Sequence, residues 1–111
     1  MNKILKLREF LNLDFAVSWS EGDKVYKYLT EILDEADEII VDFMNIEITT
    51  TVFLNAAFGQ LYRDYSISQM EIIKMINIKP TQQQLLEKVI KTAQHYHNDS
   101  ESFNINAKKH F

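Results

Sequence analysis

Amphipathic stripes alternate with short apolar runs along this chain, and that alternation constrains the fold more than any other feature. Three segments repeat apolar residues at intervals of three and four, which is the spacing of one face of an α-helix. Before and between them lie shorter runs rich in leucine, isoleucine and valine, whose length is typical of strands. The stripes occupy residues 25–36, 54–65 and 85–96, and the runs occupy residues 4–7, 11–17, 38–43 and 71–76.

Strands that alternate with helices predict a layered α/β fold with right-handed crossover connections. We expect one domain, an α/β sandwich in the order strand–strand–helix–strand–helix–strand–helix, with a mixed sheet of about four strands and about three helices. The almost continuous apolar run 38–43 indicates a strand buried on both faces or nearly so. The alternating run 11–17 indicates a half-buried strand, which at a sheet edge could support a homodimer. We expect residues 1–98 to form the domain and residues 99–111, which show no clear period, to form a flexible C-terminal tail.

Composition excludes several classes of protein. The 111 residues contain no cysteine, which excludes a disulfide scaffold, a thiolate zinc site and a cysteine nucleophile. The formal net charge is -4, and no basic stripe with interleaved aromatic residues could neutralise nucleic-acid phosphates. No apolar run is long enough to span a bilayer, and the first residues lack the apolar stretch of a signal peptide. We therefore expect a cytoplasmic protein that has neither a nucleic acid nor a membrane as its partner.

No motif for catalysis or for cofactor binding is present. Gly22 and Gly59 are the only glycines, so the chain has no glycine-rich phosphate loop or dinucleotide fingerprint. His95 and His97 are two residues apart on a predicted helix, which turns their side chains about 200° from each other and away from a shared metal ion. No serine, histidine and acid are arranged as a nucleophilic triad. We expect no enzymatic activity, no cofactor and no metal site.

The segment 41–51 is the most informative about function, because it joins the end of a predicted strand to the start of a predicted helix. In open α/β sheets, binding sites gather outside the carboxyl ends of the strands. A threonine hydroxyl at a helix start is a cap, a phosphate ligand or a phosphorylation target, and the cap is the simplest interpretation. Trp19, which we expect in the loop before the first helix, is a residue type common in interface hot spots. The partner-binding candidates are Met44, Asn45, Glu47, Thr49, Thr50, Thr51 and Trp19.

The same segment resembles the STAS-like domain of unknown function, a family of bacteria and mobile elements related to the STAS domain of anti-sigma factor antagonists. The shared pattern is a strand that ends in a hydrophobic residue followed by Asp-Phe, then a turn, then Ile-Thr and a serine or threonine before a helix that begins with Phe. The order of the predicted helices and strands also resembles that of the family over about residues 13 to 97. In this chain the pattern reads Ile40-Val41-Asp42-Phe43, then Asn45-Ile46-Glu47, then Ile48-Thr49-Thr50-Thr51-Val52-Phe53-Leu54-Asn55.

The resemblance implies a STAS-like sandwich and a non-enzymatic regulatory module that acts by protein–protein interaction. In STAS antagonists, a serine at this helix start is phosphorylated by a GHKL-type kinase that is also the anti-sigma factor. By position the match falls on Thr51, or on Thr50 with a shift of one residue. The resemblance therefore implies a GHKL-type ATPase or kinase as the partner and a phosphorylation switch at one of these two threonines.

Two other functions stay open at this point. One is a small-molecule or nucleotide-binding sensor at the same strand end, suggested by the helix N-terminus. The other is an inhibitor or accessory protein of a mobile element that acts by protein binding through the acidic first helix, with Asp34, Glu35, Asp37 and Glu38.

Overall fold

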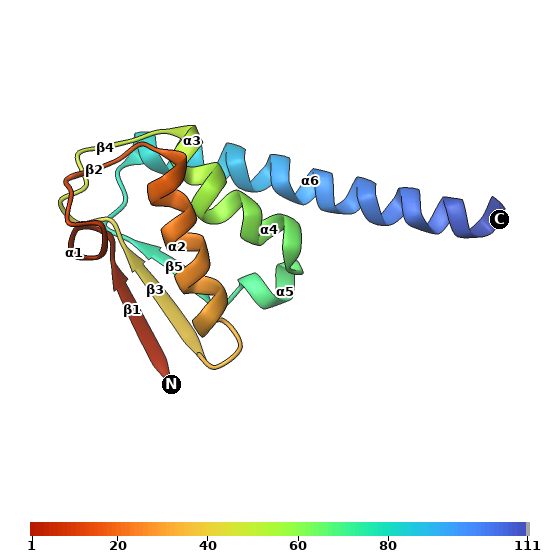
Figure 1. The fold of residues 1–111 in the computed structure, drawn as a ribbon, viewed down its shortest axis with the longest axis horizontal. Helices are drawn as coiled ribbons and strands as arrows, with labels where there is room; N and C mark the ends of the chain where they lie inside the picture. The colour runs from red at the N-terminus through yellow and green to blue at the C-terminus, as the bar shows by residue number, and fades with distance from the viewer. Residues whose placement is uncertain (111) are drawn as a thin grey trace.

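A parallel three-stranded sheet forms the base of the fold. The structure, a computed structural model, describes the backbone of residues 1–110 and the side chains of residues 1–95. The strands lie in the order β1 (Asn2–Lys6), β3 (Glu38–Asp42) and β5 (Ile73–Ile76), and both pairs are parallel (Figure 1). The central strand β3 is therefore hydrogen-bonded on both sides, whereas β1 and β5 are edges.

A second, two-stranded sheet stands apart from the first. It pairs β2 (Phe15–Ala16) with β4 (Ile48–Thr49), again in parallel. The expected α/β class is confirmed, but the expected single mixed sheet of four strands is wrong. All the pairs in the described chain are parallel, and five strands are divided between two sheets.

The helices also differ from the expected set in number and order. α1 (Leu7–Leu11) and α2 (Trp19–Ile32) precede β3, and a continuous helical segment follows β4. That segment, which we call the 51–64 segment, has a π-helix in its middle, and π-helices often occur near functional sites. It consists of α3 (Thr51–Leu54), the π-helix η1 (Asn55–Gly59) and α4 (Gln60–Asp64); α5 (Ile67–Met70) and α6 (Pro80–His110) complete the chain.

The N-terminal region departs most from the expected order. Leu7, expected in the first strand, begins α1 and is fully buried. Asn12 follows this helix with a φ of 56°, the left-handed conformation that ends helices and breaks an extended chain. Of the strand expected over residues 11–17, only Phe15–Ala16 remains in a sheet. The edge that suggested a homodimer is therefore two residues long.

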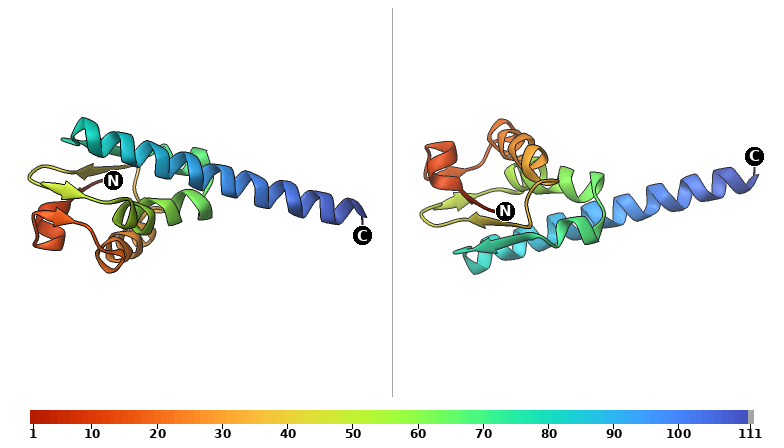
Figure 2. Two further views of the ribbon diagram at one scale, coloured as in Figure 1. Left: turned by 90° about the horizontal axis from the view of Figure 1, so that it is seen from above. Right: turned by 90° about the horizontal axis from the view of Figure 1, so that it is seen from below.

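α6 is longer than the helical stripe in the sequence indicates. Residues 99–110, expected to be a flexible tail, continue the helix, which projects well beyond the rest of the fold (Figures 1 and 2). The boundary between a domain and a flexible tail after residue 98 stays a prediction. Within the described chain, no helix has the length and apolar character needed to cross a membrane.

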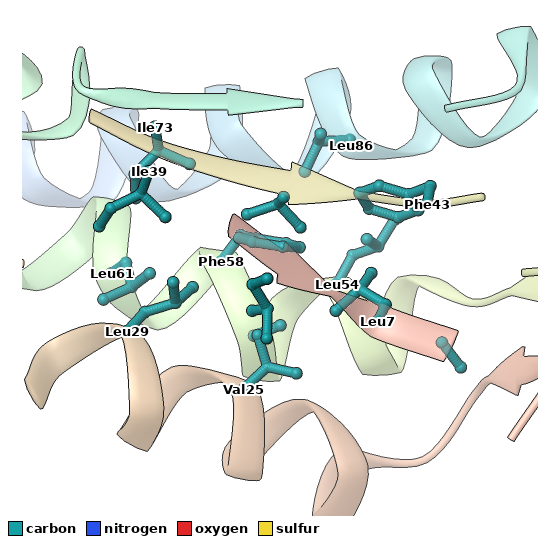
Figure 3. Packing of buried hydrophobic residues seen from close by; sticks show 14 of the residues in the cluster. Leu7, Val25, Leu29, Ile39, Phe43, Leu54, Phe58, Leu61, Ile73 and Leu86 are labelled. Carbon is teal, nitrogen blue, oxygen red and sulfur yellow. The ribbon is translucent and has the colours of Figure 1, made fainter. Parts of the chain in front are cut away.

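All the long helices pack on one face of the main sheet. α2, the 51–64 segment and α6 lie side by side over it (Figures 1 and 2). The strand order explains this arrangement, because two right-handed crossovers that step in the same direction place their helices on the same side. The core between the two layers is apolar and is shown in Figure 3; its largest members include Leu29, Ile39, Phe43, Phe53, Phe58, Leu61 and Leu86.

The other face of the main sheet is left open by the described chain. Ile39 and Val41 of β3 are buried under the helices, whereas Ile40 between them is only partly buried. Ile4 of β1 pairs with Ile40 and is 60% exposed. Residues 38–43, expected to be buried on both faces or nearly so, are therefore fully buried only on the face toward the helices and partly buried on the other. Parallel sheets are usually covered on both faces, so this open face is unusual.

α2 approaches the 51–64 segment closely at Gly22. A Cβ atom on Gly22 would lie 2.5 Å from the carbonyl oxygen of Phe53 and 2.6 Å from Cβ of Ala56. Any side chain larger than hydrogen would therefore push the two helices apart. The glycine is required here for space between backbones, not for an unusual φ angle.

We predict that Gly22→Ala lowers the free energy of unfolding by about 2 kcal/mol, because the overlap outweighs the helix propensity of alanine. Gly59→Ala is the matched control, since its Cβ would meet the movable Oδ1 of Asn55 at 3.0 Å. That change should alter stability by less than about 1 kcal/mol. Urea denaturation followed by circular dichroism measures both values. Equal losses in the two variants would contradict the role given to Gly22.

Candidate functional site

The loop after β3 is held by the carboxylate of Asp42. Its Oδ1 accepts hydrogen bonds from the backbone N–H of Met44 and from Nδ2 of Asn77, both at 2.9 Å. Asn45 then turns the chain with a φ of 65°, and Ile46 returns to the core with 1% of its surface exposed. Met44 and Asn45 are exposed at the tip of a loop that is fixed at both ends.

A buried glutamine fixes the same loop from α6. Gln82 is 3% exposed, and its Nε2 donates to the carbonyl oxygen of Ile46 at 3.1 Å. Its Oε1 accepts from the backbone N–H of Lys79 at 3.0 Å. The ammonium group of Lys79 lies 3.7 Å from the carboxylate of Glu47. Glu47, a predicted binding residue, is therefore one member of an exposed ion pair.

Thr49 and Thr50 join the start of α3 to the segment before α2. Thr49 is buried, and its hydroxyl donates to the carbonyl oxygen of Ala16 at 2.9 Å. The hydroxyl of Thr50 donates to the carbonyl oxygen of Val17 at 2.6 Å and accepts from the N–H of Phe53 at 3.2 Å. The predicted helix cap is thus confirmed at Thr50. Both hydroxyls are occupied by bonds that hold the fold.

Thr51 differs from its two neighbours. It is the first residue of α3, it is exposed, and its hydroxyl makes no hydrogen bond to any side chain or backbone group in the described part of the chain. Of the two candidates for phosphorylation, Thr51 therefore presents its hydroxyl to solvent, and Thr50 uses its hydroxyl in the cap.

Trp19 lies within a helix rather than in the expected loop. Ser18 caps α2, because its Oγ accepts from the N–H of Glu21 at 3.1 Å and donates to the Glu21 carboxylate at 2.7 Å. Trp19 is the first residue after this cap and is 49% exposed. It lines a groove of about 260 Å³ together with Asn55, Gly59 and Arg63 of the 51–64 segment and Thr92 and Ala93 of α6.

Four large apolar side chains are exposed where α2 and α3 begin. Phe15 and Ile48 are opposite each other in the β2–β4 pair, and both are exposed. Trp19 and Val52 follow on the first turns of α2 and α3, and Val52 is half exposed. We call Phe15, Trp19, Ile48 and Val52 the apolar rim. Phe15, Ile48 and Val52 are not among the binding residues predicted from the sequence, because a short apolar run does not show which of its members remain on the surface.

The predicted site residues fall into two groups. Thr50, Thr51 and Trp19 lie together at the starts of α3 and α2. Met44 and Asn45 instead line a cavity of about 180 Å³ beside β1 and α1, together with Lys6, Arg8, Glu9 and Asp42. The apolar rim belongs to the first group.

Side-chain hydrogen bonds join α2 to α4 at positions that follow Trp19 along α2. The side chain of Gln60 donates to Asp23 at 3.3 Å, and the ammonium group of Lys27 lies 3.2 Å from the same carboxylate. These two contacts, the hydrogen bond first, hold the pKa of Asp23 below its ordinary value. The hydrogen bond from Tyr26 to Asp64, 2.8 Å long, together with burial raises the pKa of Tyr26 to about 12. α2, which carries Trp19, is therefore fixed against the 51–64 segment, which carries Val52.

The acidic cluster lies away from this site. Asp34, Glu35 and Asp37 are in the turn between α2 and β3, since α2 ends at Ile32, before the position expected. Asp37 binds the amino group of Met1, and this contact lowers its pKa. The acids therefore do not line a helix face, and they lie at the opposite end of α2 from Trp19 (Figure 1).

Metal binding was not expected. Among the side chains that the structure describes, no three or more histidines, aspartates or glutamates come together as a metal site would require. The side chains of His97 and His110 lie outside the described residues.

We predict that Thr50→Ala lowers the free energy of unfolding by about 1–2 kcal/mol, because it removes a helix cap and the bond to Val17. Thr51→Ala is the control and should change stability by less than about 0.5 kcal/mol, as is usual at the surface. Urea denaturation of both variants measures the difference. A larger loss for Thr51→Ala than for Thr50→Ala would contradict the assignment of the cap.

A comparison with known protein families identifies the family to which the chain belongs. The sequence model of a family described as the STAS-like domain of unknown function matches residues 21–84, which is more than half of the chain. The match begins at residue 21, inside α2, and covers β3, the loop, β4 and the 51–64 segment, but neither β1 nor Trp19. Comparisons with curated proteins and with solved structures give no match. The chain therefore belongs to the family of STAS-like domains.

Proposed function

We propose that this chain is a cytoplasmic, non-enzymatic regulatory module that binds a protein partner through the apolar rim and the start of α3. The single observation that carries the proposal is the exposure of four large apolar side chains around the capped start of α3. Single exposed apolar residues are common on protein surfaces, whereas several in one place mark an interaction site. Membership of the STAS-like family supports a regulatory role based on protein interaction.

The rigidity of the surroundings supports the same proposal. The hydroxyls of Thr49 and Thr50 bond to the backbone of Ala16 and Val17 and so join the elements that carry the rim residues. A surface that is already ordered loses little conformational freedom when a partner binds. Trp19 is the residue from which we expect the largest contribution, because a half-exposed tryptophan next to a groove is typical of a hot spot.

We further propose that phosphorylation of Thr51 regulates this binding and that the partner is a GHKL-type ATPase or kinase, by analogy with STAS antagonists. A phosphate adds a charge of about -1.5 to -2. On Thr51 it would lie next to Val52 in the sequence, within the apolar rim. Burying that charge against an apolar partner surface is unfavourable, so phosphorylation should release the partner.

The alternatives have less support. A small-molecule sensor at the end of β3 would need a pocket there, and the cavity lined by Asp42, Met44 and Asn45, at about 180 Å³, is smaller than the range of about 300–1,000 Å³ common for ligand sites. An inhibitor that acts through Asp34, Glu35 and Asp37 would use a surface at the other end of α2. The homodimer expected through residues 11–17 stays a prediction, with only Phe15–Ala16 left in a strand there.

The proposal is tested by first capturing the partner with the tagged chain from its host and identifying it by mass spectrometry. Binding of the purified partner is then measured for Trp19→Ala and Val52→Asp. We predict that each variant weakens binding at least about tenfold, because hot-spot truncation or a buried charge costs more than about 1.4 kcal/mol. Thr51→Glu should weaken binding in the same direction, while Thr51→Val should not.

The matched control is Ile67→Asp. Ile67 is 56% exposed on α5, away from the rim, and its replacement should leave the dissociation constant unchanged. Partner binding that withstands Trp19→Ala and Val52→Asp, or that Ile67→Asp weakens as strongly, would overturn the proposed surface.

A further inference from the structure

The edge strand β1 has an open side that the candidate site does not use. It is paired with β3 along one edge only, and no strand of the described chain lies along its other edge. β1 also lies outside the residues matched by the STAS-like family. An exposed strand edge of this kind is a template for pairing with another chain.

The hydrogen-bonding pattern shows which groups face the open edge. The N–H of Asp37 donates to the carbonyl oxygen of Met1, and Asn2 is opposite Glu38 in the parallel register. Backbone groups alternate in direction along a parallel strand, so Lys3 and Leu5 bond to β3. The N–H and C=O of Asn2 and Ile4 therefore point outward, and so does the N–H of Lys6.

The open edge is bordered by an apolar groove. The groove has a volume of about 470 Å³, and the rings of Phe10 and Tyr28, which both line it, pack against each other with their centroids 5.3 Å apart and their planes tilted by 43°. Phe10 and Ile4 are both exposed. The groove lies along the strand, between its backbone and the helices α1 and α2, and is lined by Ile4, Leu5, Lys6, Glu9, Phe10 and Tyr28.

We propose that a second copy of this chain occupies the edge, with the two β1 strands paired antiparallel about a two-fold axis at Ile4. In that register Ile4 lies opposite Ile4 of the second copy, and the outward N–H and C=O groups of the two residues bond to each other. Asn2 lies opposite Lys6 of the second copy, and Lys3 lies opposite Leu5. All five residues of β1 are paired, and no like charges are opposed.

Antiparallel pairings of the two β1 strands that are centred on the residues next to Ile4 are less favourable. Pairing centred on Lys3 places two ammonium groups opposite each other, which destabilises an antiparallel pair. Pairing centred on Leu5 reaches α1, which begins at Leu7, so that only residues 4–6 are paired. The register centred on Ile4 also joins the apolar surfaces, because Ile40 lies beside Ile4 on the open face of each sheet.

The size of the contact indicates how tight the dimer is. Two five-residue strands with their flanking aromatic rings form a smaller interface than the roughly 800 Å² per partner of a stable complex. We therefore expect a dissociation constant on the order of 10–100 μM. The dimer would be a continuous six-stranded sheet with both apolar rims free, since β1 is outside the rim.

The test is sedimentation velocity of the full chain, with any tag at the C-terminus, from about 5 to 500 μM. We expect the mass to rise with concentration from 13.1 kDa toward twice that value. Ile4→Lys places two lysines together on the axis and should weaken dimerisation more than tenfold. Ile67→Lys is the matched control, since Ile67 has a similar exposure, 56% against 60%, on another element.

Substitution of Asn2 tests the register itself. Asn2→Asp places a carboxylate opposite Lys6 of the second copy at two equivalent positions and should tighten the dimer about fivefold. Asn2→Lys should weaken it by a similar factor. The two substitutions should have the opposite effects on the stability of the monomer, because residue 2 lies opposite Glu38 within one chain. Asn2→Lys should therefore raise the melting temperature of the monomer, and Asn2→Asp should lower it.

These opposite trends separate a dimer contact from an effect on folding. Dimerisation that follows the predicted order for Asn2 and fails for Ile4→Lys supports the proposal. A mass of 13.1 kDa at every concentration would overturn it. A dimer that Ile4→Lys leaves intact, or one that Trp19→Ala abolishes instead, would also overturn it, because the second copy would then be bound elsewhere.

Discussion

The close contact between α2 and the 51–64 segment is the constraint on which the candidate site depends. Gly22 lets the two backbones approach to a distance that a side chain would prevent. That approach allows Thr50 to bond to Val17 and places Trp19 beside Asn55 and Gly59. The site is thus produced by helix packing, and the apolar rim is the part of the packed surface that the described residues leave exposed.

A second consequence of the topology is an open sheet. Both crossover connections step from β1 to β3 to β5 in one direction, so the helices share one face. Ile4 and Ile76 consequently remain exposed, and no strand of the described residues pairs with the outer edge of β1. The chain therefore presents two separate surfaces: the rim at the starts of α2 and α3, and the edge of β1. Two surfaces allow a module to bind a partner and a second copy at the same time.

The sequence predicts the parts of this fold that rest on local periodicity. The stripes at residues 25–36 and 54–65 correspond to α2 and the 51–64 segment, and the run 38–43 corresponds to β3. The cap among the three threonines follows from residue type alone. The run 11–17 was misleading, because its alternation mimics a strand although Asn12 adopts a left-handed conformation after a helical turn. The open face and the exposure of Ile48 depend on strand order, which no local pattern contains.

The central claim is that a partner binds the apolar rim, and hydrogen–deuterium exchange of the chain with its captured partner tests it most directly. Bound and free chains are compared peptide by peptide at one protein concentration. The account predicts that the partner slows exchange in residues 15–19 and 48–55, which contain the rim and the start of α3. Slower exchange confined to residues 34–38, or no change within residues 15–19 and 48–55, would contradict it.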